Sequence, residues 1–500
     1  MKKLSVLLIL IFTLFTCGCP SVGPNYKRPA VDVPGTYRGV TPEDTAQPQP
    51  PAAQETPKPA ETPSQQGSQP GNVTAQVAAP SSGVSIGDQK WWEVFQDPQL
   101  QALIRTALEQ NYDVRIAAAR ILQAQAQYRI TRADQLPTVT AGAAAVNERF
   151  PNTKALPEYE TSATSVSASL AWELDFWGKY RRATEAARAD LLATQWGRRA
   201  VINSLVSDVA SAYFQLRAYD LQLEIARRTL ASRQQSLELT RTLADGGAAT
   251  MLDVRQAEQL VAIAAETIPD LERRIQQQEN YTSILLGKNP GPITRGMALT
   301  EQPHAPEVPA GLPSNLLARR PDIRQAEDQL IAANARIGVA RAAYFPQIFL
   351  TATGGFLSSA LSSLFTGPAG LWNFGGAVTQ PIFAGGRIKG GVKLAEARKE
   401  EMVLVYQRTI QEAFRGVSDA LVAYRKNREF RQHQEELVLA AQDAAELSEV
   451  RFRGGAANYL EVLTNETNAF NAELGLAQAR LNELLALVEI YRNLGGGWET

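Results

Sequence analysis

Residues 164–174, Thr-Ser-Val-Ser-Ala-Ser-Leu-Ala-Trp-Glu-Leu, alternate apolar side chains with mostly small or polar ones. A period of two residues points every second side chain to the same face, so this stretch predicts a β-strand with one apolar face. The same alternation occurs at Val139, Ala141, Ala143 and Ala145, at Ile348, Leu350, Ala352 and Phe356, and at Trp372, Phe374, Val378 and Ile382. The sequence therefore predicts four strands in two hairpins, 137–175 and 346–383, each strand about ten residues long, as a tilted membrane-spanning strand needs.

The rest of the chain carries the period of long helices. Apolar residues follow a 3,4 spacing from Ile202 to Leu230, from Val254 to Ile275 and from Leu460 to Tyr491. A seven-residue repeat of this kind is typical of left-handed coiled coils. We expect the first of these helices to run from about Lys179 to Ala244, which makes it on the order of 100 Å long at 1.5 Å per residue.

The chain is also an internal duplication, a feature that decides the fold. One set of residues recurs at an offset of 209 (322 − 113): Asp113, Arg115, Ala117, Ala124, Ala126, Arg132, Ala133 and Pro137 reappear as Asp322, Arg324, Ala326, Ala333, Ala335, Arg341, Ala342 and Pro346. Two structural repeats, 91–310 and 311–500, follow from this. Each is expected to contain a helix, a hairpin, and two long helices joined by a tight turn near residue 246 or 454.

Glycine pairs mark the two turns, Gly246-Gly247 in the first repeat and Gly454-Gly455 in the second. Glycine adopts a positive φ without steric cost, which allows the chain to reverse between antiparallel helices. These four glycines are therefore predicted at the far tips of the two helical hairpins.

The first residues have the features of a secretory signal. Met1-Lys2-Lys3 is basic, and Leu4–Phe15 is apolar but too short to span a bilayer as a helix. The only cysteines of the chain, Cys17 and Cys19, follow directly, so we expect no disulfide and no cysteine metal site in the processed chain.

Gly18-Cys19 resembles a bacterial lipoprotein cleavage site. This predicts a signal peptide over residues 1–18 and an acylated segment over 19–41 that begins at Cys19; Cys17 is the less favoured acylation site, and an ordinary cleaved signal is the other alternative. Pro20 in place of an aspartate after the cysteine favours the outer membrane. From Pro42 to Pro80 the chain has almost no large apolar residue, so residues 42–90 are expected to form a disordered tether.

Strands in lipid must close into a barrel, because an open sheet edge leaves backbone groups without hydrogen bonds. Four strands are too few, since single-chain barrels of this kind start at about eight. Several copies must therefore pool their hairpins: two copies would give about eight strands and three about twelve, and periodicity alone leaves both open. The long helices, continuing from the strand ends, would wall a second tunnel in the periplasm.

Several segments carry a resemblance to a known family. They are VGPNYKRP after Cys19, WWEVFQDPQLQALIRTALEQNYDVRIA, IPDLERRIQQQENYTSILLGKNPG, LLARRPDIRQAEDQLIAANARIGVARAAYFPQI, PIFAGGR and YRNLGGGW. The chain resembles the outer-membrane efflux factor family of TolC-like channels, in its lipoprotein branch that serves RND-type tripartite pumps. The resemblance implies a mixed, mainly α fold: a homotrimer with a twelve-stranded transmembrane β-barrel continued by a long α-helical coiled-coil barrel, docked to a periplasmic adaptor and an inner-membrane RND-type pump.

The resemblance also implies candidate site residues. In this family polar and charged residues close the periplasmic tip, and the matching segment here is SEVRFRGGAANYL, residues 448–460. It assigns the gate to Glu449, Arg451 and Arg453, with Asp443 and Glu446 higher on the same helix, although exposed charges near a helix end are often only solvated. Gly246, Gly247, Gly454 and Gly455 match the family's tip turns that contact the adaptor.

Enzyme chemistry and nucleic-acid binding are not expected. Lys and Arg total 50 against 51 Asp and Glu, so there is no large excess of positive charge for nucleic acid. The only histidines, His304 and His433, stand far apart without metal-ligand spacing, and no catalytic triad or phosphate loop occurs. No cofactor is expected beyond the covalent lipid on Cys19.

The leading interpretation is a passive conduit in the outer membrane, lipid-anchored and projecting into the periplasm, for export of drugs or other small toxic compounds. Two alternatives are a channel for type I protein secretion and a periplasmic adaptor lipoprotein. The four alternating strands count against the adaptor, and the lipoprotein start and the segment LLARRPDIRQAE count against type I secretion.

Overall fold

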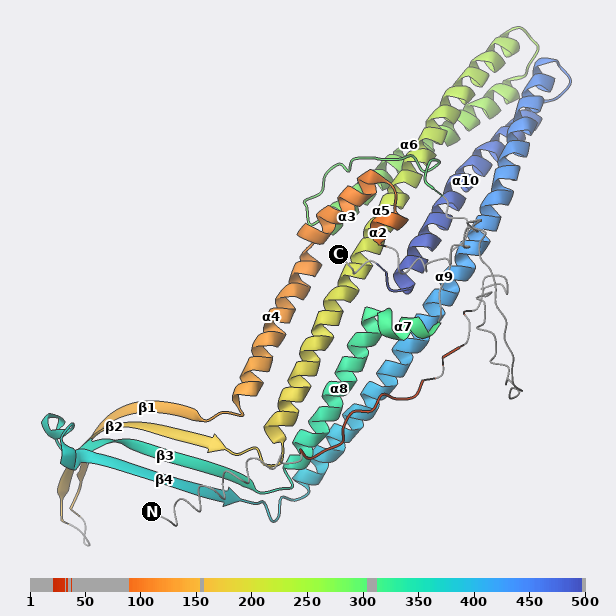
Figure 1. Ribbon diagram of the computed structural model, residues 1–500. Helices are drawn as coiled ribbons and strands as arrows, with labels where there is room; N and C mark the ends of the chain where they lie inside the picture. The colour runs from red at the N-terminus through yellow and green to blue at the C-terminus, as the bar shows by residue number, and fades with distance from the viewer. Residues whose placement is uncertain are drawn as a thin grey trace, which may run out of the picture. The chain divides into compact units, whose positions relative to one another are not determined.

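The computed structural model describes residues 21–31, 33–34, 37, 90–152, 157–303 and 313–496. The predicted signal peptide, Cys17, Cys19, His304 and nearly all of the predicted tether lie outside these residues. The chain is mainly helical with one small sheet (Figure 1). It divides into two compact units, one comprising 1–32, 112–202 and 317–412, the other 33–111, 203–316 and 413–500.

The elements repeat in order and in length. The first repeat contains α4 (Tyr112–Ala133), β1 (Thr138–Phe150), β2 (Tyr159–Glu173), α5 (Lys179–Asp245) and α6 (Met251–Leu285), and the second contains α8 (Pro321–Ala342), β3 (Gln347–Ser358), β4 (Gly370–Thr379), α9 (Arg387–Arg453) and α10 (Tyr459–Asn493). The matching helices are equally long, with 22 residues in α4 and α8, 67 in α5 and α9, and 35 in α6 and α10. This equality confirms the internal duplication.

Shorter elements complete the fold. Helices α2 (Trp91–Val94) and α3 (Pro98–Gln110) precede α4, α7 (Pro313–Arg319) precedes α8, and the 3-10 turns η3 (Leu361–Ser363) and η4 (Gly367–Ala369) join β3 to β4. Helix α6 continues through Pro269. None of the helices in the described ranges is both long and apolar enough to cross a membrane.

The sheet has the strand order β1-β2-β3-β4, with all neighbours antiparallel. Its register gives it two different faces, because residues paired across strands point the same way. One cross-strand row reads Val139, Leu170, Ala352 and Phe374, and the adjacent row on the opposite face reads Thr140, Ser169, Thr353 and Asn373. The alternating residues predicted from the sequence therefore share one apolar face, and the other face is small and polar.

The strand ends differ from the sequence prediction in two places. The first hairpin lies within the expected bounds, but its strands have 13 and 15 residues and are longer than expected. Its far end is held by the stacked rings of Phe150 and Tyr159, whose centroids lie 4.6 Å apart, and by an ion pair between Arg149 and Glu158. The second hairpin ends sooner. Ile382, which the alternation assigned to the last strand, lies beyond β4, because Pro381 cannot donate a ladder hydrogen bond.

Two tryptophans tie the strand ends to neighbouring segments of the same chain. Trp172 Nε1 donates to the carbonyl of Gln135 at 3.1 Å, and Trp177 Nε1 donates to that of Pro346 at 2.7 Å. Trp372, by contrast, is 75% exposed and stacks on Phe374. The first two indoles thus serve as internal links, whereas the third lies open on the apolar face.

Residues 21–28, here called the N-terminal strap, lie against α8. The Val22 amide donates to the carbonyl of Trp177 at 2.9 Å, and Asn334 Nδ2 donates to that of Pro24 at 2.9 Å. Arg28 Nε donates to Glu327 Oε1 at 2.7 Å. Gly23, with φ 112°, packs so closely on Gly338 that a β-carbon would lie 2.5 Å from the Gly338 Cα. The strap therefore begins beside the strand ends and follows α8.

The long helices pack through the predicted seams. One core cluster joins α5, α6 and α10 through Ile225, Ala226, Leu271, Phe470 and Ala477. In the other unit, Ala186 and Ala189 of α5 pack against Ala332 and Ala335 of α8. Burial of these apolar stripes, more than local helix propensity, stabilises helices of this length.

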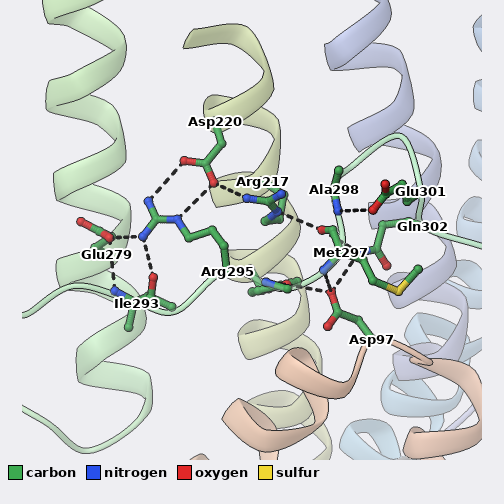
Figure 2. Close-up of polar contacts among 12 residues, drawn as sticks. Asp97, Arg217, Asp220, Glu279, Ile293, Arg295, Met297, Ala298, Glu301 and Gln302 are labelled. Carbon is green, nitrogen blue, oxygen red and sulfur yellow. Dashed lines mark hydrogen bonds and ion pairs between the residues drawn. The ribbon is translucent and has the colours of Figure 1, made fainter. Parts of the chain in front are cut away.

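A buried carboxylate connects α3, α5 and the loop after α6 (Figure 2). Asp97 caps α3 through the amides of Gln99 and Leu100. Its other oxygen accepts hydrogen bonds from Tyr213 Oη at 2.7 Å and, from the loop, the Met297 amide and Gln302 Nε2, both at 3.0 Å. Burial by itself would raise the pKa of Asp97, but these hydrogen bonds lower it below the ordinary value.

The same loop is held a second time by Arg295. Its guanidinium donates to both carboxylate oxygens of Asp220 on α5 at 3.2 Å and pairs with Glu279 on α6, as Figure 2 shows. Arg217 adds a bond of 3.0 Å from its Nε to the carbonyl of Met297. The loop is therefore fixed to three helices by charged hydrogen bonds.

Asp97→Asn is expected to lower the free energy of unfolding by about 2–4 kcal/mol, because a side-chain amide would place an N–H group among donors that need an acceptor. Urea unfolding of the detergent-solubilised protein, followed by circular dichroism, measures this. Asp134→Asn, at an exposed position, is the control and should change stability little; equal effects of the two substitutions would contradict the prediction.

The contribution of Asp97 should also depend on pH. A carboxyl whose pKa is lowered by folding stabilises fully above its unfolded pKa of about 3.9 and loses this contribution as the pH falls through the lower, folded value. The difference in stability between wild type and Asp97→Asn should therefore be constant near neutral pH and shrink below about pH 4.

Candidate functional site

The two tip turns have the same backbone geometry. Gly247 has φ 78° and Gly455 has φ 73°. After α5 the Ala248 amide donates to the carbonyl of Leu243 at 2.8 Å, and after α9 the Ala456 amide donates to that of Arg451 at 2.8 Å. This is the Schellman arrangement, which requires a left-handed residue after the helix end. Glycine is needed at Gly247 and Gly455, whereas their neighbours Gly246 and Gly454 have no positive φ.

Exposed apolar side chains lie beside both tips. Leu252 at the start of α6 is 65% exposed, and its repeat counterpart Leu460 at the start of α10 is 53% exposed. Val450 on the last turns of α9 is also exposed. Each tip thus presents a glycine turn next to an uncovered leucine.

The predicted gate charges form ion pairs within their own hairpin. Glu449 pairs with Arg453 one turn later on α9. Across the turn, Arg451 Nη1 lies 3.5 Å from Glu461 Oε1 on α10. Asp443 and Glu446 are exposed, and within the described part of the chain neither forms an ion pair. The structure therefore brings three of the five predicted gate residues to the second tip turn and leaves two free along α9.

An aromatic contact lies between the two arginines predicted for the gate. Phe452, between Arg451 and Arg453, packs on Tyr459 with ring centroids 5.2 Å apart. Tyr459 is buried in a cluster with Leu237 of α5 and Leu260 of α6, among others. The inward side chain between the two arginines thus couples the end of α9 to the other hairpin.

A buried ion pair near the tips was missed by sequence reasoning. The side chain of Arg233 on α5 is 1% exposed; its Nη1 donates to the carbonyl of Leu260 at 2.9 Å, and its Nε lies 3.8 Å from Glu466 Oε2 on α10. Its guanidinium also lies 5.0 Å from the ring of Phe470. Arg233 continues the 3,4 spacing after Leu230, so a charged residue at a seam position was the signal that could have found it.

Burial affects both members of this pair. It raises the pKa of Glu466 above its ordinary value and lowers that of Arg233, in each case against the opposing effect of the partner. Such a pair contributes little net stability, but loss of one partner leaves an uncompensated charge. It links the first hairpin to α10 at a point where the two must keep a fixed register.

No cluster of three or more histidine, cysteine, aspartate or glutamate side chains that could hold a metal ion occurs in the described ranges. His433 contacts Glu436 on the same helix. The candidate functional features are the two tip turns, the charged residues beside the second turn, and the sheet with one apolar and one polar face.

Comparison with known proteins gives a consistent result. The family model "Outer membrane efflux protein" matches residues 103–288 and 312–496. TtgC of Pseudomonas putida, named a probable efflux pump outer membrane protein, is 37% identical over 496 residues, which cover 98% of this chain and 96% of TtgC. Outer membrane protein OprJ of Pseudomonas aeruginosa is 33% identical over 503 residues, covering 100% and 97%.

Solved structures agree on the fold. The open state of the Neisseria gonorrhoeae MtrE outer membrane channel matches with a TM-score of 0.80 at 29% identity, over 96% of this chain and 99% of that one. The mainly helical, internally duplicated fold expected from the sequence is confirmed, as is the family resemblance. The chain belongs to the outer membrane efflux protein family.

Proposed function

We propose that three copies of this chain form a passive conduit across the outer membrane and the periplasm, as the channel of a tripartite efflux system that exports drugs or other small toxic compounds. The observation that carries the proposal is the sheet. It has an apolar face, a small polar face and two outer edges, on β1 and β4, with no partner strand in the described residues.

Such a sheet is stable in lipid only when its edges are paired, because unpaired backbone groups there cost several kcal/mol each. Pairing β4 of one copy with β1 of the next closes a barrel with the apolar face toward lipid. Three copies supply about twelve strands, enough to leave a lumen lined by the small polar face. The apolar face with Trp372 and Phe374 is the one that would meet lipid.

The names of several relatives support the proposed class of exported compounds. Several are named toluene, solvent or antibiotic efflux pump outer membrane proteins. Energy and substrate selection would come from an inner-membrane RND-type pump. The conduit itself would contribute passage only, without a cofactor.

A lipid on Cys19 would anchor the chain. Support comes from the N-terminal strap, whose first hydrogen bond, from Val22 to Trp177, lies three residues after Cys19 and close to the strand ends. An acyl group on Cys19, so close in sequence to this point, would be able to enter the lipid without displacing the strap.

The two tips would dock a periplasmic adaptor. Each tip presents a rigid glycine turn and an exposed leucine, Leu252 or Leu460, at equivalent places in the two repeats. An adaptor that binds one tip can bind the other in the same way.

The charges of the second tip would form the resting gate. Glu449 and Arg451 each hold a neighbouring part of the hairpin by an ion pair. Repeated around a threefold axis, they and Arg453, Asp443 and Glu446 would form rings of charge that narrow the pore. Removal of one residue of an ion pair would leave the side chain of its partner free to change conformation.

For the gate, Glu449→Ala and Arg451→Ala should each increase the resting conductance of the purified trimer in planar lipid bilayers, because Arg453 or Glu461 loses its partner. Glu412→Ala is a matched control: it breaks the exposed pair of Arg408 and Glu412, also four residues apart on α9, and should leave conductance unchanged. Channels unaffected by both gate substitutions would remove the gate and keep the conduit; a soluble, non-conducting protein would overturn the conduit.

For docking, Leu252→Glu and Leu460→Glu should weaken adaptor binding about tenfold or more, corresponding to 1.4 kcal/mol or above, because a charge replaces the apolar contact. The readout is the toluene tolerance of a Pseudomonas putida strain that lacks TtgC and carries this chain. Either tip variant should give lower tolerance than the wild-type chain. Leu439→Glu, at an exposed leucine elsewhere on α9, should restore tolerance like wild type. Full restoration by both tip variants, at equal trimer levels, would refute docking at these leucines.

A further inference from the structure

The buried pair of Arg233 and Glu466 is an incomplete ion pair. The two atoms that face each other, Arg233 Nε and Glu466 Oε2, lie 3.8 Å apart, which is too far for a hydrogen bond. Neither atom has another hydrogen-bond partner within the described part of the chain, and both are shielded from solvent. Buried polar atoms in folded proteins are nearly always hydrogen-bonded, and an unsatisfied one raises the free energy of the packed state. The contact between α5 and α10 is therefore less favourable than a fully hydrogen-bonded pair.

The guanidinium of Arg233 does not depend on the charge of Glu466 for its position. Its Nη1 donates to the main-chain carbonyl of Leu260 on α6 at 2.9 Å, and its Nη2 donates to the main-chain carbonyl of Glu466 on α10 at 3.5 Å. It also lies over the ring of Phe470. These partners are neutral. Arg233 can therefore keep α5, α6 and α10 in register whether the Glu466 side chain carries a charge or not.

The surroundings of the Glu466 carboxyl disfavour its charged form. The charged or titratable side chains that face it in the described residues are Arg233 from α5, Glu449 from α9 and Tyr459 from α10, and α6 adds the carbonyl of Leu260 and apolar side chains. Burial has the largest effect and raises the pKa of Glu466; Arg233 opposes this, and the like charge of Glu449 raises the pKa again. A neutral carboxylic acid thus suits this place better than a carboxylate.

The internal duplication supplies a matched glutamate in a different environment. Helix α10 corresponds to α6 at an offset of 208 (459 − 251), so the counterpart of Glu466 is Glu258 (466 − 208). Glu258 is partly exposed and accepts hydrogen bonds from Arg241 at 2.8 Å and from Arg255 at 2.7 Å. These hydrogen bonds lower its pKa. The same position therefore stabilises a charged carboxylate in the first hairpin and disfavours one in the second.

We propose that the negative charge of Glu466 opposes the packed arrangement of the tip, so that the ionised residue favours a wider tip and the protonated residue a narrower one. The proposal rests on the proposed conduit and its gate. It names the group that sets how readily that gate opens.

The position of Glu466 couples its charge to the gate. It lies about 10 Å along α10 from Tyr459, and Tyr459 contacts Phe452, which stands between the gate arginines Arg451 and Arg453. Widening the pore at the end of α9 moves the second hairpin against the first, which separates α10 from α5 at this level. Water that enters there hydrates the carboxylate and recovers the free energy lost on its burial.

The dependence on pH follows from the raised pKa of Glu466. A carboxyl that binds its proton more tightly in the packed state shifts the equilibrium toward that state as the pH falls. The resting conductance of the wild-type trimer should therefore decrease as the pH falls through the raised pKa, which lies above the ordinary value of about 4.3 for glutamate. Glu466→Gln is neutral at every pH, so this part of the pH dependence should be absent from the variant.

Conductance of the purified trimer in planar lipid bilayers is the first test. At pH 7.5 the resting conductance of Glu466→Gln should be about threefold or more below that of wild type, because the variant favours the packed tip. Glu258→Gln is the matched control and should conduct like wild type. A conductance of Glu466→Gln equal to or above that of wild type would overturn the proposal, as would a wild-type conductance that rises on acidification while that of Glu466→Gln does not. The wild-type arm needs no substitution.

Hydrogen exchange measures the same bias without a channel. In the full chain in detergent at neutral pH, Glu466→Gln should slow amide exchange in residues 450–466 by about threefold or more, because local opening becomes rarer. Glu258→Gln should leave exchange there unchanged. Faster exchange in Glu466→Gln would show that the charge holds the tip together, and the proposal would be wrong.

The two measurements separate this proposal from the proposed function. If the wild-type protein conducts as a trimer, but Glu466→Gln changes neither conductance nor exchange, the role of Glu466 is wrong and the conduit stands. If the wild-type protein does not conduct, the conduit fails, and hydrogen exchange still decides whether the charge of Glu466 opposes the packing of α10 on α5.

Discussion

The structure depends on one constraint: backbone amides and carbonyls that lie in lipid must all be hydrogen-bonded within protein. The four strands satisfy this internally at three junctions and, within the described residues, leave two edges open. That part of the chain does not close its own sheet, so closure needs further strands. The helices α4 and α9, which adjoin the outer strands β1 and β4 along the chain, also carry exposed isoleucine, leucine and valine side chains.

Internal duplication also places a contact between the two repeats inside one chain. The contact between α5 and α8 is built from alanines, a glycine and one exposed ion pair.

The ends of the long helices near the two tip turns are held by a different kind of contact. There the two hairpins of the chain are coupled by a few buried contacts, namely the pair of Arg233 and Glu466 and the packing of Tyr459 against Leu237 and Leu260. Surface ion pairs such as that of Glu449 and Arg453 contribute little stability and can exchange partners readily. The buried contacts therefore fix the register of the two hairpins, and the exposed charges are left to the surface of the tip.

The sequence by itself determined the strand phases, the duplication, the lengths of the long helices and the positions of Gly247 and Gly455. Each of these depends on a local period or on a backbone requirement that a single stretch of chain reveals. It did not determine that Ile382 lies outside the last strand, that Arg233 is buried against Glu466, or that Glu449 and Arg451 have partners within one hairpin. The end of β4 follows from Pro381, and the partners of Glu449 and Arg451 follow from the geometry of one helical hairpin. The contact of Arg233 with Glu466 follows from the register between helices far apart in the sequence. A seven-residue repeat leaves that register open to slips of whole heptads, and only the packed tertiary structure, through its capped turns and buried contacts, selects one.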